Sequence, residues 1–84
     1  LKKRKTNLDL KIGTWNVKTM LQTGKLQEIA DTLDSYNMDL TALQEIRWKG
    51  VGRIDKRQFT LLYSGNPQKQ GQNGVGFIIN NRIK

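Results

Sequence analysis

The sequence contains neither cysteine nor histidine among its 84 residues, and it contains a single proline. Without cysteine the chain forms no disulfide and no thiolate metal site. Without histidine it lacks the usual general base near neutral pH and the most common zinc ligand. These absences exclude disulfide-stapled scaffolds, thiolate zinc sites and histidine general-base chemistry within the chain.

Long apolar runs are also missing. No segment approaches the roughly 20 apolar residues that a membrane-spanning helix needs, and no secretory signal is visible in the sequence. We therefore expect no membrane association and a reducing compartment, either the nucleus or the cytoplasm. The length suits one small domain with a modest core.

Acidic residues are scarce relative to basic ones. Seven Asp and Glu face fifteen Lys and Arg, which gives a net charge of +8. From residue 46 onward the acid is Asp55, and the basic residues are Arg47, Lys49, Arg53, Lys56, Arg57, Lys69, Arg82 and Lys84. Such a surface attracts a polyanion, and DNA is the first candidate partner. The alternative is that the charge serves solubility alone.

The hydrophobic pattern predicts an α/β domain with one mixed sheet. Alternation predicts a strand in "LDLKIGTWNV" (8–17), and i, i+3, i+4, i+7 spacing predicts a helix in "GKLQEIADTLDSYN" (24–37). Short apolar runs predict strands at 38–46, 58–65 and 74–80. A strand, a helix and a strand within about 30 residues predict a right-handed parallel crossover. The loop at 65–74 predicts an antiparallel hairpin.

We expect residues 1–8 to be a basic leader and residues 9–84 to form the domain. The basic run Lys2 to Lys5 is typical of a nuclear-import signal or of an arm that binds nucleic acid. The alternative is a solvated tail without structure.

The predicted strands are apolar on both faces, as in "LTAL", "TLLY" and "GFII". One helix of about three turns covers part of one face. We therefore expect a second layer, supplied by the rest of a longer protein or by another copy of the chain. The chain begins at Leu1 and stops directly after an apolar run, so we also expect it to be a piece of a longer protein.

Two polar residues end the strands of the predicted crossover. Asn16 closes the first strand and Glu45 closes the second. Ligands of open α/β sheets bind at the carboxyl ends of parallel strands, and Mg²⁺ prefers oxygen ligands while keeping several waters. The pair therefore suggests half of a metal site. The alternative is that both are ordinary solvated residues at strand ends.

A second candidate site follows Glu45. In "IRWKGVGRIDKR" an aromatic residue stands among cations, which suits base stacking combined with phosphate binding. The predicted nucleic-acid-binding residues are Arg47, Trp48, Lys49, Arg53, Lys56 and Arg57. The alternative is an exposed hairpin or loop with a packed tryptophan. For Trp15 we expect packing against the core.

The series "IGTWNV", crossover, "DLTALQEIRW" and "GVGFIIN" resembles the start of the endonuclease/exonuclease/phosphatase family, whose fold is deoxyribonuclease I-like. Within this family, the sequence most resembles endonuclease domains derived from non-LTR retrotransposons. The resemblance runs from about Leu10 to Asn80. It implies a sandwich of two mixed sheets with helices outside, of which this chain would be part.

The resemblance also implies roles for matching residues. Glu45 would be a ligand of Mg²⁺ (or of Mn²⁺ in its place), and Asn16 would position the scissile phosphate or the water shell of the metal. The reaction would be phosphodiester hydrolysis of DNA. Abasic-site endonucleases have Thr-Lys after the "QE", whereas this chain has Ile46 and Arg47, so the resemblance does not extend to abasic-site specificity.

The family's later catalytic elements, which include a Tyr, an Asp and Asn pair and a closing Asp and His, have no counterpart in this sequence. We therefore expect a fragment of a Mg²⁺-dependent endonuclease that is inactive by itself. Two alternatives stay open. One is a non-catalytic interaction module, a domesticated remnant of a retroelement, and the other is a phosphatase of the same family that acts on small phosphate esters.

Overall fold

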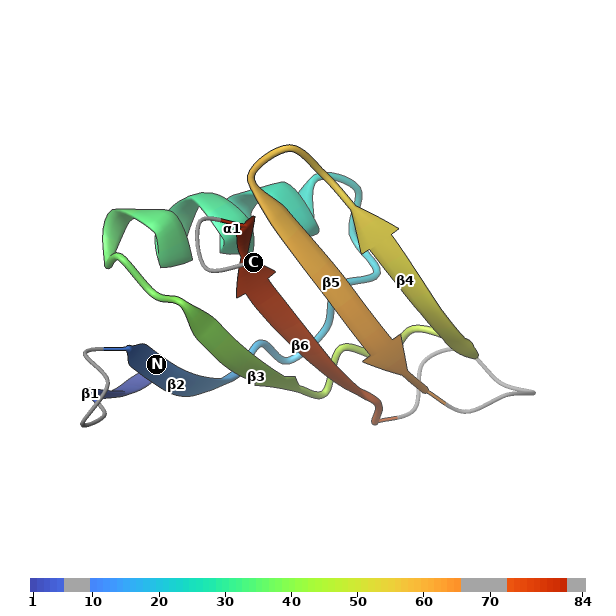
Figure 1. Ribbon diagram of the computed structural model, residues 1–84. Coiled ribbons are helices and arrows are strands. Elements are labelled where there is room, and N and C mark those ends of the chain that lie inside the picture. Colours follow the sequence, from blue (N-terminus) through green and yellow to red (C-terminus); the bar gives the residue numbers. More distant parts are fainter. Residues whose placement is uncertain (6–9, 66–72, 82–84) are drawn as a thin grey trace.

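The computed structural model describes residues 1–5, 10–65 and 73–81. Within these residues the chain forms one helix and six strands (Figure 1). The elements in chain order are β1 (Lys2–Lys5), β2 (Lys11–Asn16), α1 (Lys25–Ser35), β3 (Leu40–Gln44), β4 (Val51–Asp55), β5 (Phe59–Ser64) and β6 (Val75–Asn80). The strands predicted at 8–17, 38–46, 58–65 and 74–80 and the helix predicted at 24–37 correspond to β2, β3, β5, β6 and α1.

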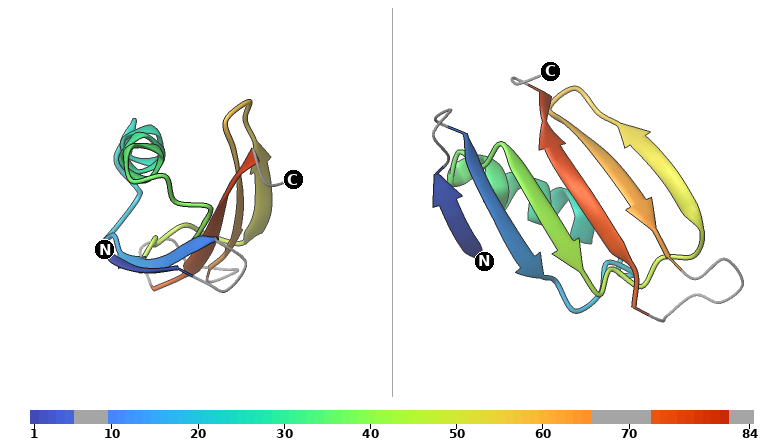
Figure 2. Two further views of the ribbon diagram at one scale, coloured as in Figure 1. Left: turned by 60° about the vertical axis from the view of Figure 1, so that its left-hand side comes forward. Right: turned by 60° about the horizontal axis from the view of Figure 1, so that its bottom comes forward.

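The six strands form one mixed sheet in the order β1-β2-β3-β6-β5-β4, seen side by side in Figure 2. Strands β2 and β3, which flank α1 in the chain, pair in parallel, and the other neighbouring pairs are antiparallel. The predicted parallel pairing across the helix, the antiparallel pairing of the last two strands and the mixed sheet are thus confirmed. The loop between β5 and β6 lies mostly outside the described residues.

Helix α1 begins and ends at residues with left-handed backbone. Gly24, at the N-cap, has a φ of 85°, a conformation that glycine adopts without steric cost. Asn37 has a φ of 56°, and its N–H bonds the carbonyl of Asp34 while the N–H of Met38 bonds that of Leu33. This is the Schellman arrangement, in which asparagine substitutes for glycine. Asn37, the last residue of the predicted helical segment, thus terminates the helix, whose last helical residue is Ser35.

One face of the sheet packs against α1 (Figure 2). The helix buries Ile29, Ala30 and Leu33, and the sheet contributes its own buried side chains to the same cluster, which include Leu43, Phe59, Leu61 and Ile78. Trp15 packs against this cluster, as the sequence predicts. The core therefore lies between α1 and this covered face.

No described element covers the opposite face, which we call the open face. Strand registers place Thr14, Ala42, Phe77, Leu62 and Arg53 in one row across it. Leu62 is 39% exposed and Phe77 45% exposed. The centre of the open face is apolar and unburied within the described part of the chain, which is the arrangement that the two-faced strands predict. Self-association across it stays a prediction.

Strand β1 is a departure from the sequence-based expectation. The run from Lys2 to Lys5 pairs with β2 as an antiparallel edge strand instead of lying outside the sheet. Gly13 of β2 makes this possible, because a Cβ at Gly13 would collide with the backbone oxygen of Lys2 and with Cε of Met38. The run has no apolar alternation, so periodicity could not reveal the strand.

Strand β4 is not among the strands predicted from the sequence. Residues 51–55 lie in the segment for which a hairpin or loop is the alternative to a nucleic-acid-binding segment, and they form an antiparallel hairpin with β5 at the other edge of the sheet. Their turn back into β5 is closed by the Lys56 N–H, which donates to the carbonyl of Phe59 at 2.8 Å. Ile54 is half-buried and Val51 is 79% exposed, which leaves little hydrophobic signal for a strand.

Adjacent leucines of β5 provide a test of the two faces. Leu61 is fully buried on the covered face, whereas Leu62 lies on the open face. We expect Leu61→Ala to lower the free energy of unfolding by about 2–5 kcal/mol because it leaves a cavity. Leu62→Ala should cost less than about 1 kcal/mol at low protein concentration. Urea unfolding followed by circular dichroism measures both, and equal losses would contradict the assignment of faces.

Candidate functional site

Parallel pairing of β2 and β3 brings the two predicted strand-end residues together. Asn16 is the last residue of β2 and pairs in register with Gln44, the last residue of β3. Glu45 follows directly. We call the edge formed by Asn16, Glu45 and Arg47 the polar rim. It lies at the carboxyl ends of the two parallel strands, where open α/β sheets bind their ligands.

The backbone at Glu45 and Arg47 is left-handed, with φ values of 56° and 64°. Non-glycine residues seldom adopt this conformation, and it costs about 1–3 kcal/mol where tertiary contacts impose it. Here the contacts belong to Ile46, which is fully buried. Its N–H bonds the carbonyl of Gly74 at 3.3 Å and its carbonyl accepts the N–H of Met20 at 2.9 Å.

Burial of Ile46 has a direct consequence for its neighbours. Because Ile46 points into the core, Glu45 and Arg47 are turned outward onto the rim. Their side chains are 37% and 41% exposed, and Arg47 Nη2 lies 3.5 Å from Glu45 Oε1. An ion pair this exposed stabilises the fold little, so its effect is to hold two opposite charges at a fixed place on the rim.

Asn16 links β2 to the carboxylate. Its Nδ2 donates a hydrogen bond to Glu45 Oε2. Its Oδ1 accepts the backbone N–H of Lys18 at 3.0 Å, which fixes the orientation of the amide. Lys18 is exposed and has a φ of 63°. Lys18 is not among the site residues predicted from the sequence; its position two residues beyond the strand end is the signal that could have identified it.

The donor set of the rim fits a metal ion in part. Mg²⁺ often binds through one or two carboxylates and keeps waters that substrate phosphate replaces. Glu45 supplies one carboxylate, whereas Asn16 turns its Nδ2 toward that carboxylate and its Oδ1 toward the Lys18 N–H. The described residues contain no cluster of three or more Asp and Glu that could hold a metal by themselves. The neighbouring Arg47 guanidinium opposes a cation and favours a phosphate oxygen beside it.

Trp48 is occupied by contacts within the protein. Its Nε1 donates a hydrogen bond to the carbonyl of Met20 at 2.8 Å. Its ring meets that of Tyr63 edge to face, with centroids 5.0 Å apart. Gly65 allows this segment to lie close, because a Cβ there would collide with the backbone oxygen of Trp48. The geometry favours the packed-tryptophan alternative over base stacking.

The remaining predicted nucleic-acid-binding residues do not gather at one place. Lys49 is exposed two residues beyond Arg47 of the polar rim. It lines a groove of about 490 Å³ near the start of α1, to which Gln22 and Leu26 also contribute. Arg53 is on the open face of β4, where its hydrogen bond to Asp55 raises its pKa further above the ordinary arginine value. Its charge is therefore already paired.

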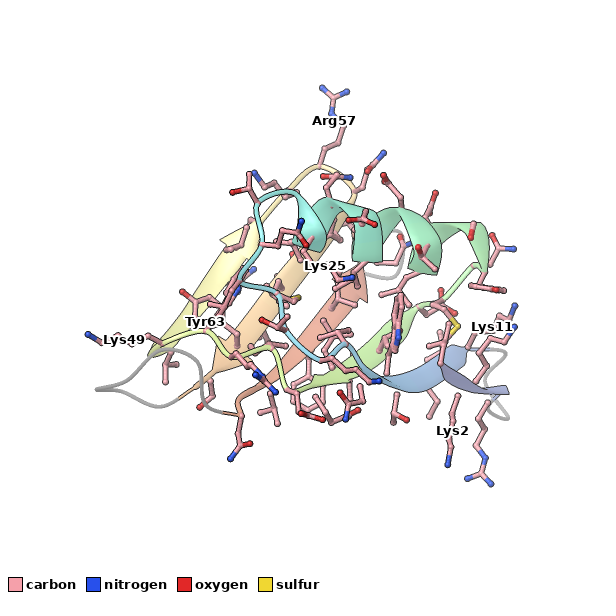
Figure 3. The ribbon with its side chains drawn as sticks, turned by 180° about the vertical axis from the view of Figure 1, so that it is seen from behind. Lys2, Lys11, Lys25, Lys49, Arg57 and Tyr63 are labelled. Carbon is pink, nitrogen blue, oxygen red and sulfur yellow. The ribbon has the colours of Figure 1, made fainter. Side chains whose placement is uncertain are left out.

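Lys56 and Arg57 are exposed in the turn between β4 and β5. The rim-side end of β4 is Val51, which aligns through β5, β6 and β3 with Asn16. Asp55 lies four residues farther along the strand, about 13 Å away, and the turn lies beyond it (Figure 3). Strand β4 thus separates these two cations from Arg47 and Lys49. Their role in binding stays a prediction.

Fold and rim together define the class of protein: an α/β chain with one mixed sheet, one covering helix within the described residues, and a polar rim at the ends of two parallel strands. No helix in the described part of the chain is long and apolar enough to cross a membrane.

Two mammalian proteins are similar to the chain. Craniofacial development protein 2 of Tragulus javanicus is 36% identical over 73 residues, which is 87% of this chain and 12% of that protein. Craniofacial development protein 2 of Bos taurus is 34% identical over 73 residues, with the same two shares. The chain thus spans 12% of the length of these relatives. No family model matches the chain.

Replacement of Trp48 tests its packing role. Trp48→Phe keeps an aromatic ring but removes the Nε1–H donor, so the Met20 carbonyl loses its partner. We expect the free energy of unfolding to fall by about 0.5–1.5 kcal/mol, and DNA affinity to stay within about twofold, since a packed ring contributes no stacking. Chemical unfolding and fluorescence anisotropy measure the two effects. Unchanged stability with a large loss of DNA affinity would contradict the assignment.

Proposed function

We propose that the chain is part of an endonuclease/exonuclease/phosphatase-type domain that hydrolyses phosphodiester bonds of DNA with Mg²⁺. The observation that carries the proposal is the juxtaposition of Asn16 and Glu45 at the carboxyl ends of adjacent parallel strands. The motif "WN" followed by "LQE" is what the resemblance relies on, and β2 and β3 bring both fragments to one rim. The net charge of +8 supports a polyanionic substrate.

The proposed fold is a deoxyribonuclease I-like sandwich. Its support is the open face, on which strand register places Leu62, Val75 and Phe77, all of them exposed. Sheets pack face to face about 10 Å apart through such side chains. In the proposed domain a second sheet, supplied by a longer protein, covers these residues. The length of the mammalian relatives is consistent with further chain outside the matched segment.

In the proposed mechanism the rim binds the scissile phosphate. Glu45 would hold the Mg²⁺, which supplies Lewis-acid stabilisation of the charge that develops on phosphate oxygens. Asn16 positions the carboxylate through its Nδ2 and is itself oriented by the N–H of Lys18. Arg47, when released from Glu45, donates to a phosphate oxygen. Each group acts on charge that grows in the transition state.

A second candidate function is a nucleic-acid-binding module without catalysis. One observation favours it: both oxygens of Glu45 already have partners, Arg47 on Oε1 and Asn16 on Oε2. A carboxylate whose two oxygens are both occupied holds Asn16 and Arg47 in place at the rim. The basic surface then binds phosphates through Coulomb attraction and counterion release alone.

Paramagnetic Mn²⁺ distinguishes the two candidates on the 84-residue chain. We expect low Mn²⁺ concentrations to broaden the amide NMR signals of Asn16, Glu45 and Ile46 first, because the ion binds the Glu45 carboxylate. Glu45→Gln should abolish this selective broadening. Glu28→Gln, the matched change of a carboxylate in the first turn of α1, should leave it intact. Broadening that is the same in Glu45→Gln as in the unchanged chain would exclude Glu45 as a ligand.

The activity of the chain by itself is a separate prediction. We expect no Mg²⁺-dependent nicking of supercoiled plasmid by the 84-residue chain, because one carboxylate and one amide supply a fraction of the groups that phosphodiester hydrolysis needs. Agarose electrophoresis with EDTA and Glu45→Gln controls measures this. Nicking that disappears in both controls would show that the rim suffices for hydrolysis and would overturn the prediction of inactivity.

A further inference from the structure

Strand β1 is a basic strand at the edge of the sheet. It is an outer strand of the sheet, and its residues from Lys2 to Lys5 are all basic. Lys2, Lys3 and Arg4 are exposed, and no carboxylate of the described residues forms an ion pair with them. Charged residues on edge strands commonly prevent aggregation through strand pairing. Whether β1 also binds a ligand depends on which groups lie beside its side chains.

The two faces of β1 differ. Lys3 turns toward α1, where its Nζ lies 4.1 Å from the centre of the Tyr36 ring at the end of the helix. Lys11 reaches the same residue and donates to the Tyr36 carbonyl at 2.7 Å. Because side chains alternate along a strand, Lys2 and Arg4 turn the other way, onto the open face. Figure 3 shows Lys2 pointing away from the helix.

A hollow of about 410 Å³ lies beside β2 and is bordered by Lys2, Lys3, Arg4, Ile12, Gly13 and Thr14. Of its three cations, Lys3 has its Nζ over the Tyr36 ring on the covered face, which leaves Lys2 and Arg4 on the open face. Thr14 is exposed and lies opposite Lys2 in the strand register. The hollow thus combines an ammonium, a guanidinium and a hydroxyl group. These are the side-chain groups that bind nucleic-acid phosphates.

The hollow leads to the polar rim. Thr14 and Asn16 are on the same face of β2, two residues apart, and Lys2 pairs with Thr14. Lys2 and Asn16 are therefore diagonal neighbours on adjacent strands, about 7–8 Å apart, a separation that long side chains bridge. Arg4 pairs with Ile12, one step farther from the rim on the same face. The order along the open face is Asn16, Lys2, Arg4.

A layer packed on the open face would not cover these cations. Lysine and arginine are almost never fully buried unless they are paired, and the described residues give Lys2 and Arg4 no acidic partner. The apolar centre of the open face, with Phe77 and Leu62, lies three and four strands away from β1. The cations thus stay at the margin of any such layer.

We propose that β1 is a phosphate-binding strand, in which Lys2 and Arg4 contact successive backbone phosphates of a DNA strand that leads to the polar rim. The Thr14 hydroxyl donates a hydrogen bond to an oxygen of the phosphate nearest Lys2. The inference rests on the proposed function in taking DNA as the partner. It assigns the binding path to the β1 edge of the sheet, which neither the resemblance nor the basic segment after Glu45 includes.

Binding without cleavage tests the path. The assay measures fluorescence anisotropy of a labelled DNA duplex with the 84-residue chain in EDTA, so that no metal-dependent step contributes. For the double variant Lys2→Gln, Arg4→Gln we expect affinity to fall about tenfold or more. The slope of log K against log salt, measured between about 50 and 200 mM, should lose about 2 because two phosphate contacts disappear.

The matched control is Lys3→Gln, which removes a charge from the same strand but from its opposite face. It should keep the affinity within about twofold of the unchanged chain. The double variant Lys2→Arg, Arg4→Lys keeps the charges and should restore binding, which separates loss of contact from loss of fold. Equal losses from Lys3→Gln, or unchanged affinity and salt slope in the Gln double variant, would overturn the proposal.

Two further outcomes separate this inference from the proposed function. If Glu45 fails to bind Mn²⁺ while Lys2 and Arg4 carry DNA affinity, the nuclease proposal fails and the binding path stands. If Mn²⁺ binds at Glu45 but the Gln double variant binds DNA like the unchanged chain, the path fails alone. A chain that binds polyglutamate and no DNA would overturn the path in favour of an acidic protein partner.

Discussion

The parallel pairing of β2 with β3 is the constraint on which the rest of the structure depends. It requires a crossover, and α1 meets that requirement while it covers one face of the sheet. It aligns the last residue of β2 with the last residue of β3, so the side chains that end both strands share one edge. The antiparallel neighbours β6 and β1 then extend the sheet on either side of this pair, and the rim lies between them.

The apolar elements could be predicted from the sequence because their periodicity comes from the core that they share. Leu26, Ile29, Ala30 and Leu33 mark α1, and the dense apolar runs mark β3, β5 and β6. Strands β1 and β4 could not be predicted in this way. An edge strand can form through backbone hydrogen bonds to one neighbour, so Lys2–Lys5 and Val51–Asp55 need few buried side chains. Gly13, whose lack of a side chain admits β1, is informative only once its neighbours are known.

The site could be predicted to a similar extent. Sequence order places Asn16 and Glu45 at strand ends, and the sheet brings them within hydrogen-bonding reach. The sequence does not reveal that the chain turns left-handed at Glu45 and Arg47 around a buried Ile46, since this depends on contacts with Met20 and Gly74. It likewise treats "IRWKGVGRIDKR" as one basic segment, whereas strand formation at 51–55 carries Lys56 and Arg57 to the far end of the sheet. The catalytic roles of Asn16 and Glu45 and the binding roles of Lys56 and Arg57 remain predictions.

The left-handed backbone at Glu45 restricts which sequences can preserve the rim. Glycine, asparagine and aspartate tolerate this conformation better than other residues do. Of these three, aspartate alone keeps a carboxylate, and it is one methylene shorter than glutamate. Substitution of Glu45 by glycine or asparagine would therefore relieve the backbone but remove the negative charge. Substitution by aspartate would keep the charge but draw it back from Asn16. A chain that keeps glutamate here retains conformational strain of about 1–3 kcal/mol, which selection for stability alone would tend to eliminate.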